Sequence, residues 1–200
     1  MKARYLILFS SFFFLANESD AQIEKYFEFW STTDSEFANP ETSPLKEEAI
    51  ADFDSVARFD YDPSFAVEGI FEEVKRQKPF TFQTTGSIKQ RYQKAGLLKF
   101  KVDTIEYVLS AYRNLELMRM PGYENRLFIP FTDASNGNGT YEGGRYLEME
   151  IPAGKEVLID FNLVYNPYCA YSDRYSCPIP PRENDLPIAI EAGAKSPMKE

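Results

Sequence analysis

Seven short segments rich in apolar, aromatic and β-branched residues constrain the fold of this chain more than any other feature of its sequence. In the clearest case, Leu98, Phe100 and Val102 alternate with Lys99 and Lys101, a period of two that is typical of a β-strand with one buried face. The segments span residues 65–71, 80–84, 98–102, 105–111, 128–131, 157–161 and 186–190. No long helical stretch separates them, so a parallel βαβ sheet is disfavoured and an antiparallel sandwich or barrel is favoured.

One or two helices are predicted in front of these strands. Over residues 22–37 the large apolar side chains recur at spacings close to the helical period, and Asn39-Pro40 ends that segment. Ser43 has the character of an N-cap with Pro44 at the first helical position, which predicts a second short helix over residues 44–53.

These elements predict one mainly β domain, an antiparallel β-sandwich or barrel-like fold preceded by the helices. Asp103-Thr104 separates two strand segments and is expected at the tip of a hairpin. The 17 Phe and 13 Tyr are enough to build a sizeable core, and no internal repeat or Gly/Ser-rich linker divides the chain. We expect the domain to span residues 22–195, with fraying after Ala192 and a tail over residues 196–200.

Charge and histidine content exclude several classes of function. The 31 acidic residues exceed the 22 basic ones, so the formal net charge is −9. This balance argues against a nucleic-acid partner, which requires a basic face. The sequence contains no histidine, which removes Ser-His-Asp and Cys-His catalysis and every His-ligated metal site. We expect no cofactor and no bound metal.

The first 21 residues have the pattern of a secretory signal peptide. Lys2 and Arg4 make a basic start, residues 5–16 are mostly apolar and uncharged, and Ser19 and Ala21 are small residues at the −3 and −1 positions of a cleavage site. The alternative is an uncleaved anchor, but a membrane span needs roughly 20 apolar residues. We expect cleavage after Ala21, export to the periplasm or beyond the cell, and a soluble mature protein, because no second long apolar run follows.

Cys169 and Cys177 are the only cysteines, and both lie in the part expected to be exported. An even pair in an oxidising compartment favours a structural disulfide, which would stabilise the fold by roughly 2.5 kcal/mol through loop closure. Two free thiols and a redox pair are the alternatives. A metal site would need further soft ligands.

A polar, glycine-rich segment over residues 132–146 is a candidate site. Asp133 and Arg145 flank it, and they either fix the ends of a hairpin loop or form an anion-binding pocket with Arg145 at its floor. Calcium is a third interpretation, but the spacing of Asp133, Asn136 and Asn138 does not fit an EF-hand loop.

Further polar residues follow the last long strand segment. Asp160 and Asn162 need partners if they are buried. The proline-rich stretch over residues 165–187 is either a stapled structural loop or a rigid loop that presents side chains to a ligand. We hypothesise that Asp133, Arg145, Asp160 and Asn162 form one polar cluster closed by this loop, since buried charges must be paired. The candidate ligand-binding residues are Asp133, Tyr141, Arg145, Asp160, Asn162, Tyr165, Asn166, Glu183 and Asn184.

Several of these blocks resemble the domain of unknown function 1684 family, and the resemblance covers nearly all of the mature chain. The blocks are Phe131-Thr132-Asp133-Ala134, residues 139–147 (GTYEGGRYL), residues 160–171 (DFNLVYNPYCAY) and residues 177–187 (CPIPPRENDLP), with Trp30, Phe37 and Ser43-Pro44-Leu45 fitting the opening. The family ending usually reads Ala-Gly-Glu-Lys, whereas here it is Ala192-Gly193-Ala194-Lys195. The resemblance implies no activity, substrate or catalytic residue.

Three classes of function are compatible with these residues. The first is an exported binding module for a small polar ligand or a partner. The second is a small hydrolase-like enzyme that uses Asp133, Asp160 and Glu183 as acid and base, assisted by Tyr141 or Tyr165. The third is a structural envelope protein. Convergence of the carboxylates in one cavity would favour the enzyme, and an apolar cleft lined by tyrosines would favour binding.

Overall fold

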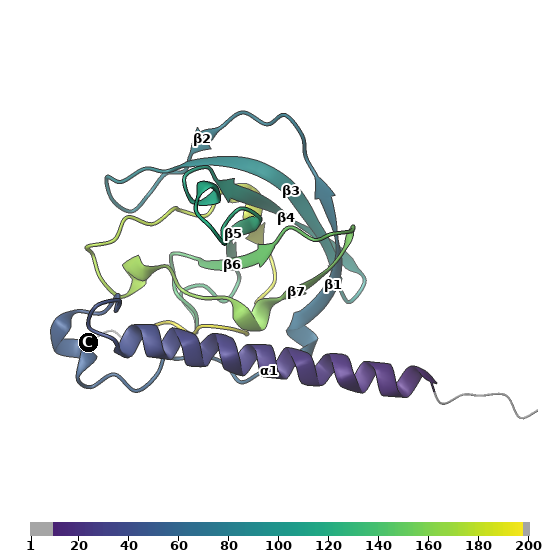
Figure 1. Cartoon of the computed structure of the whole chain (residues 1–200), viewed down its shortest axis with the longest axis horizontal. Helices are drawn as coiled ribbons and strands as arrows, with labels where there is room; N and C mark the ends of the chain where they lie inside the picture. Colours follow the sequence, from purple (N-terminus) through teal and green to yellow (C-terminus); the bar gives the residue numbers. More distant parts are fainter. Residues whose placement is uncertain (1–9, 198–200) are drawn as a thin grey trace, which may run out of the picture.

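The fold is an antiparallel sheet that curls into a half-barrel, with one long helix beside it (Figure 1). The computed structural model describes the backbone of residues 10–197 and the side chains from residue 20 onward. The helices are α1 (Ser10–Ala38) and α2 (Glu47–Ile50). The strands are β1 (Ala66–Glu73), β2 (Phe80–Thr81), β3 (Arg91–Val102), β4 (Ile105–Asn114), β5 (Arg126–Asp133), β6 (Arg145–Glu150), β7 (Glu156–Asp160) and β8 (Asp185–Leu186). The prediction of a mainly β, antiparallel, barrel-like fold behind an N-terminal helix is confirmed.

The strands follow the order β6-β5-β4-β3-β1-β7, with β2 beside β3 and β8 beside β5. Every pairing is antiparallel except β5 with β8. The hairpin of β3 and β4 is the centre of the sheet, and Val102 pairs with Ile105 across the predicted tip. Asp103 has a φ of +55°, which suits the tight turn that joins strands of the native twist.

The ring of Phe71, on β1, packs directly against the backbone of the neighbouring strand β3 at Gly96. A Cβ atom at residue 96 would lie 2.2 Å from this buried ring, so the position requires glycine. The register of β3 against β4 also shifts between Lys94 and Gly96. Such an irregularity bends a strand and increases its twist, which helps to curl the sheet.

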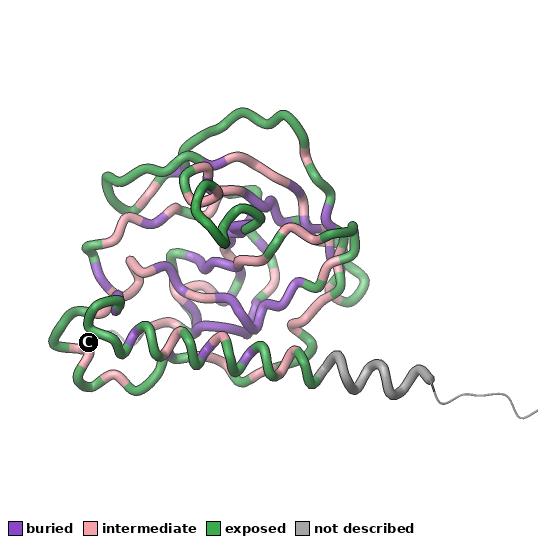
Figure 2. Tube along the Cα trace, in the orientation of Figure 1, coloured by how far each residue is buried: buried purple, intermediate pink, exposed green. Residues whose placement is uncertain are grey.

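The main core fills the inside of the curled sheet (Figure 2). The alternating residues predicted to point inward do so: Leu98 and Leu109 have no exposed surface, and Phe100 retains 2%. The largest fully buried apolar side chains also include Leu127, Ile129, Phe131, Ile159, Phe161 and Ile190. Each is worth about 1.5–3 kcal/mol in apolar burial, so this core is the main source of stability.

Helix α1 packs a second apolar cluster against the segment that follows β7. Tyr26, Trp30 and Phe37 are buried, at the spacing that the sequence indicated. The indole Nε1 of Trp30 donates a hydrogen bond to the carbonyl of Asn162 at 3.1 Å, and the Arg58 guanidinium lies 5.2 Å from the centre of the Trp30 ring. These contacts fix the helix on the edge of the half-barrel.

The predicted leader falls mostly outside the residues that can be described. Residues 1–9 are outside them, and for residues 10–19 only the helical backbone is defined, so α1 begins before the predicted start at residue 22. No helix in the described part of the chain combines the length and hydropathy required to cross a membrane.

The second helix is shorter than predicted. It spans Glu47–Ile50, with Lys46 rather than Ser43 at its N-cap. Ser43 is buried, its carbonyl accepts a hydrogen bond from Nη2 of Arg174, and its hydroxyl accepts one from the backbone N–H of Leu45 at 3.2 Å. The Ser43 hydroxyl is thus used in a local contact with Leu45, and the helix begins only at Glu47.

Two strand predictions are too long and one strand was not predicted. Strand β2 ends at Thr81, and β8 ends at Leu186 because Pro187 has no N–H to donate to a ladder. Strand β6 lies partly in the segment predicted as a loop. Leu147 and Met149 point toward the core while Glu148 points away, an alternation that the neighbouring glycines obscured.

The prediction of fraying after Ala192 is wrong. Ala192 and Ala194 have no exposed surface. The backbone N–H of Ala194 donates to the carbonyl of Val164 at 2.8 Å, and that of Ser196 donates to Gly139 at 2.9 Å. Of the predicted tail over residues 196–200, only residues 196 and 197 are described.

Candidate functional site

Arg145 and Asp133 form a buried ion pair, with 2.9 Å between Nη2 and Oδ2 and no exposed surface on either side chain. The guanidinium also donates to the carbonyls of Ile190, Ala192 and Ala194 at 2.6, 2.6 and 3.1 Å. Burial lowers the pKa of Arg145, and the charge of Asp133 opposes that effect. This group attaches the C-terminal segment to β5 and β6, as the structural interpretation of the pair requires.

Asp160 and Asn162 belong to a different group. The Asn162 amide donates to Oδ1 of Asp160 and to the carbonyl of Asp62, each at 2.9 Å, and its Oδ1 accepts from the N–H of Asp62 at 3.0 Å. Burial raises the pKa of Asp160, whose Oδ2 is buried without a hydrogen-bond partner. The single predicted cluster is therefore two clusters with different partners, one holding the C-terminal segment and one holding the chain before β1.

The proline-rich loop positions the Asn184 side chain against the backbone of the sheet and away from the candidate site. Its amide donates to the carbonyls of Ser110 and Pro130 at 2.9 and 2.8 Å, and its Oδ1 accepts from the N–H of Ser110 at 2.7 Å. Asn166 similarly donates to the carbonyl of Lys195 at 2.8 Å and to the hydroxyl of Tyr171 at 3.1 Å. Both amides are used for structural contacts.

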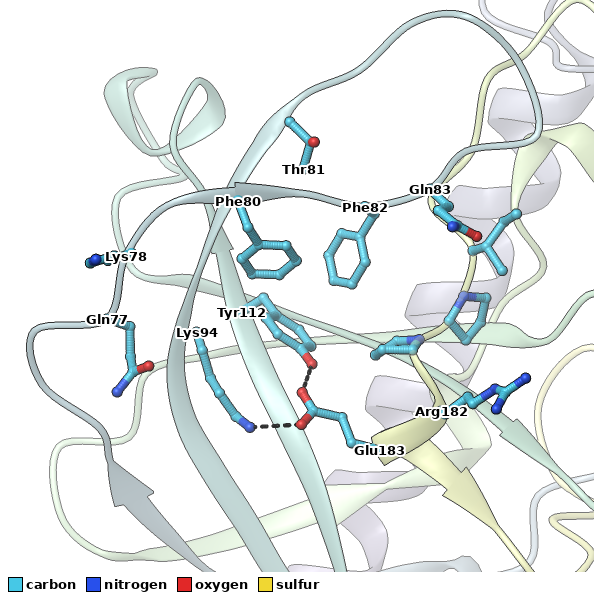
Figure 3. Close-up of a pocket in the computed structure, with 13 residues that line it drawn as sticks. Gln77, Lys78, Phe80, Thr81, Phe82, Gln83, Lys94, Tyr112, Arg182 and Glu183 are labelled. Carbon is cyan, nitrogen blue, oxygen red and sulfur yellow. Dashed lines mark hydrogen bonds and ion pairs between the residues drawn. The ribbon is translucent and has the colours of Figure 1, made fainter.

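Glu183 lies in a cavity of about 540 Å³ between the proline-rich loop and β2 (Figure 3). Lys94 and Tyr112 both point toward its carboxylate: Nζ of Lys94 is 3.1 Å from Oε2, and the Tyr112 hydroxyl donates to Oε1. Burial opposes ionisation of Glu183, but these hydrogen bonds lower its pKa. Burial and the hydrogen bond to Glu183 raise the pKa of Tyr112. A stabilised carboxylate is a weak base, so this triad is poorly suited to proton abstraction.

A larger cleft of about 770 Å³ opens between α1, the strands β3 to β6 and the segment after β7. Eight aromatic residues line it: Phe29, Tyr92, Tyr123, Phe128, Tyr146, Tyr165, Tyr168 and Tyr175. We call it the tyrosine cleft. Its rings brace one another edge to face, with 4.7 Å between the centres of Phe128 and Tyr146 and 5.8 Å between those of Tyr146 and Tyr165. Such packing presents aromatic surface in fixed positions.

Charged groups of both signs lie among these rings. Glu148 accepts from Nη1 of Arg126 at 2.8 Å and from the hydroxyl of Tyr165 at 2.9 Å. Burial and the nearby Glu148 raise the pKa of Tyr165, so that hydroxyl stays protonated. Burial opposes the charge of Arg126, but the hydrogen bond to Glu148 raises its pKa. The Arg126 guanidinium also lies 4.9 Å from the centre of the Tyr123 ring.

Both cysteines lie beside this cleft, and Cys177 forms part of its wall. The predicted disulfide between them is not formed in this structure, in which the backbone N–H of Cys169 donates to Sγ of Cys177 at 3.2 Å. Tyr141, which the sequence also singled out, hydrogen-bonds to the Cys169 side chain.

Of the residues predicted for a ligand site, only Tyr165 lines the tyrosine cleft. Arg126, Tyr146 and Glu148 were missed. The alternation across β6 could have identified Tyr146 and Glu148, because they lie on the face opposite Leu147 and Met149. A charged residue at the position between two inward-facing apolar residues of a strand lies on its outer face, and here that face borders the cleft. No comparable signal marks Arg126, at the start of β5.

Comparison with known proteins identifies relatives of equally undefined function. No protein with a curated description matches the chain. The solution NMR structure of an uncharacterized protein from gene locus rrnAC0354 of Haloarcula marismortui is similar, with a TM-score of 0.72 and 32% sequence identity, covering 90% of this chain and 96% of that one. Residues 51–195 match the family described as "Protein of unknown function (DUF1684)". The match covers the whole sheet and both blocks around the cysteines, so the chain belongs to this family.

Proposed function

We propose that this protein is a binding module for a small polar ligand, and that the tyrosine cleft is its site. The observation that carries the proposal is a preformed cavity of about 770 Å³ that combines eight aromatic side chains with charged and polar side chains, ten in all. Ligand sites are typically concave, mostly apolar and largely preformed, with a small number of placed polar groups that fix orientation.

The lining indicates the chemistry of the ligand. Lys25 and Arg126 are cationic, whereas Glu28, Glu36 and Glu148 are acidic, so the cleft has no positive excess to attract an anion. Aromatic faces attract cations and pack against flat apolar rings. A neutral hydroxyl-rich ligand or an organic cation fits this surface best.

The positions of the carboxylates argue against the enzyme alternative. Asp133 is neutralised by Arg145, Asp160 is held by Asn162, and Glu183 is paired with Lys94 in a separate cavity. Two-carboxylate hydrolysis needs both groups across one substrate bond, about 5–9.5 Å apart. Three carboxylates in three different surroundings do not meet that requirement.

A ligand screen with paired variants on α1 tests the proposal. Neutral monosaccharides and quaternary ammonium compounds are titrated while the melting temperature is followed. A ligand at 100 times its Kd should stabilise the protein by about 2.7 kcal/mol. Phe29→Ala removes a ring from the cleft and should weaken binding, whereas Phe27→Ala alters a neighbouring ring on α1 that is 63% exposed and should not.

If no compound in either class shifts the melting temperature, or if Phe27→Ala and Phe29→Ala weaken binding equally, the cleft is not the site. The third interpretation, a structural envelope protein, would then be favoured.

We also propose that the protein is exported with cleavage after Ala21, on the pattern of its leader. The position of the buried contacts supports this: Asp20 and Ala21 are exposed, and from residue 20 onward the first buried side chain of α1 is that of Tyr26. Cleavage would therefore leave the packing of Tyr26, Trp30 and Phe37 in place. The intact mass of the mature protein from its native host tests it, and an envelope species that retains residues 1–21 would contradict it.

In an oxidising compartment the expected resting state of Cys169 and Cys177 is a disulfide. Mass spectrometry of the unreduced protein measures it directly, since the bonded form is two hydrogens lighter than the dithiol.

A further inference from the structure

Cys169 and Cys177 form a pair whose two thiols differ in their surroundings. Cys177 is 8% exposed and lies in the wall of the tyrosine cleft, whereas Cys169 is half-buried. The N–H of Cys169 points at Sγ of Cys177 with 3.2 Å between the two atoms. Cys169 is thus the more exposed residue of the pair, and the sulfur of Cys177 lies in contact with its backbone.

Three hydrogen-bond donors converge on the sulfur of Cys169. The side chains of Cys177, Thr85 and Tyr141 all hydrogen-bond to Cys169. The Cys177 hydrogen bond, and after it those of Thr85 and Tyr141, lower the pKa of Cys169 against the effect of burial. The same hydrogen bond and burial raise the pKa of Cys177. The side-chain hydrogen bonds favour a thiolate at Cys169, although the backbone N–H of Cys169, which donates to Sγ of Cys177, partly stabilises a thiolate there as well.

The other titratable groups facing the pair do not compete for this charge near neutral pH. Burial raises the pKa of Tyr92 and of Tyr141 to about 12, and burial also raises the pKa of Tyr146. These phenols stay neutral. Glu142, near Tyr141, adds a negative charge that disfavours ionisation of the phenol.

The loop around the cysteines holds its shape without a crosslink. Thr85 makes two hydrogen bonds to the backbone of Cys177. Its N–H donates to the Cys177 carbonyl, and its Oγ1 accepts from the Cys177 N–H, each at 3.0 Å. The N–H of Ile179 donates to Gln83 at 2.7 Å, and that of Ser172 donates to Tyr168 at 3.1 Å. A disulfide is thus not needed to define this segment, which leaves the pair free to change its redox state.

We propose that Cys169 and Cys177 are a thiol–disulfide exchange site, with Cys169 as the attacking thiolate, Cys177 as the resolving thiol, and disulfides as the substrate class. In the first step the Cys169 thiolate attacks one sulfur of a substrate disulfide, forming a mixed disulfide and releasing the other sulfur as a thiolate. Cys177 then loses its proton to solvent and attacks Sγ of Cys169. The intramolecular disulfide forms, the second substrate thiolate leaves, and two electrons have passed from the pair to the substrate. When the pair rests as a disulfide, the same exchange runs in reverse: a substrate thiolate attacks Sγ of Cys169, Cys177 leaves, a second substrate thiolate releases Cys169, and a substrate disulfide forms.

This site is independent of the ligand proposed for the tyrosine cleft. The two proposals share Cys177 as a wall residue, and Tyr92 and Tyr146 lie beside both sites, but neither proposal requires the other's ligand, so either can fail alone.

Trapping with glutathione disulfide tests the order of attack. The folded, reduced protein is incubated with this disulfide and analysed by mass spectrometry. Cys177→Ser should accumulate one glutathione adduct on Cys169, Cys169→Ser should accumulate little, and the wild type should convert to the internal disulfide. Adduct formation on Cys177 in preference to Cys169, or no reaction at either thiol of the folded protein, would overturn the proposal.

Alkylation of the wild type by iodoacetamide gives the same information without a cysteine variant. Peptide mapping should show Cys169 labelled first, with a pH midpoint below the value of about 8.5 for an ordinary cysteine. Tyr141→Phe removes one donor and should slow labelling near pH 6.5 by roughly fivefold, while Tyr107→Phe, on β4, should leave the rate unchanged. Equal rates in both variants, or a midpoint near 8.5, would contradict a stabilised thiolate.

The alternative is a structural crosslink, and one measurement separates it. The near-ultraviolet circular dichroism of the protein is compared before and after reduction. Retention of the signal supports a redox site, whereas its loss on reduction shows a structural disulfide and overturns the proposal.

Discussion

Two polar regions of this molecule differ in how their hydrogen-bonding capacity is used. Around Arg145, one guanidinium is shared among Asp133 and three backbone carbonyls, all inside the protein. In the tyrosine cleft, Arg126 and Glu148 are paired, but their side chains remain 43% and 27% exposed beside a cavity. The first region has the stronger sequence signal for a site, but its charged groups already bind partners within the fold. The second can still take a partner.

The difference teaches that a charged residue in a glycine-rich segment indicates a site only if its partners are not already within the chain. The carbonyls that bind Arg145 come from residues 190–194, which the sequence predicted to be at the end of the domain and partly frayed. A correct prediction of that segment would have favoured the structural interpretation of Arg145 from the start.

Replacing Arg145 should have the largest effect on stability. Arg145→Ala leaves the Asp133 carboxylate buried and unpaired and deprives three carbonyls of their donor. Breaking a buried pair in this way costs about 3–5 kcal/mol, enough to unfold many domains of this size. Urea denaturation measures it, with Arg126→Ala as the matched exposed control. If Arg145→Ala folds with an unchanged midpoint but loses ligand binding, Arg145 belongs to a site and the comparison is reversed.

Asn162→Ala should come next. It removes side-chain hydrogen bonds to Asp62 and Asp160, leaves the N–H and the carbonyl of Asp62 without these partners, and removes a fully buried amide. Loss of about 2–3 kcal/mol is expected in the free energy of unfolding. Thermal denaturation by circular dichroism measures it, and Asn138→Ala, an exposed amide in the glycine-rich segment, is the control. A loss no larger than that of the control would place Asn162 outside the structural framework.

Asp160 should make stability depend on pH in an unusual direction for a carboxylate. Burial raises its folded-state pKa above the unfolded value, so the folded protein holds the proton more tightly. Its contribution is therefore present at low pH and is lost as the pH rises through the folded pKa. The free energy of unfolding of Asp160→Asn, relative to that of the wild type, should therefore rise by on the order of 1 kcal/mol between pH 4 and pH 7. Urea midpoints at both pH values test this, and a wild type that gains on the variant over the same range would contradict it.

The fold was largely predictable because its physical basis is local. Period-two alternation identified β1, β3 and β4, and short apolar runs identified β5 and β7. The aromatic spacing identified the part of α1 that packs through Trp30. Two errors have different causes. Ser43 is buried in a tertiary contact with Arg174 and does not cap α2, whereas β8 ends early at Pro187, a local signal that is present in the sequence.

The candidate site was much less predictable. The polar residues with the strongest sequence signal, Asp133, Arg145 and Asn162, are structural, because burial of a charge or amide depends on partners far away in the chain. The residues of the tyrosine cleft come from α1, four strands and a late loop. No spacing along the chain brings Phe29, Tyr92 and Tyr165 together, so only the curl of the sheet and the position of α1 could identify their common surface.

Arg126→Ala should have the smallest effect on stability and is the sharpest test of the comparison. Its ion pair with Glu148 is partly exposed and screened by solvent, so the loss should stay within about 1 kcal/mol. Glu148 keeps the hydroxyl of Tyr165 as a donor after the substitution, which limits the cost further. Ligand-induced stabilisation, in contrast, should change, because the variant alters the charge of the cleft while the fold is retained. A loss above about 2 kcal/mol would show that Arg126, like Arg145, is a structural residue whose capacity is already used, and the tyrosine cleft would then lose the feature that distinguishes it from the buried cluster.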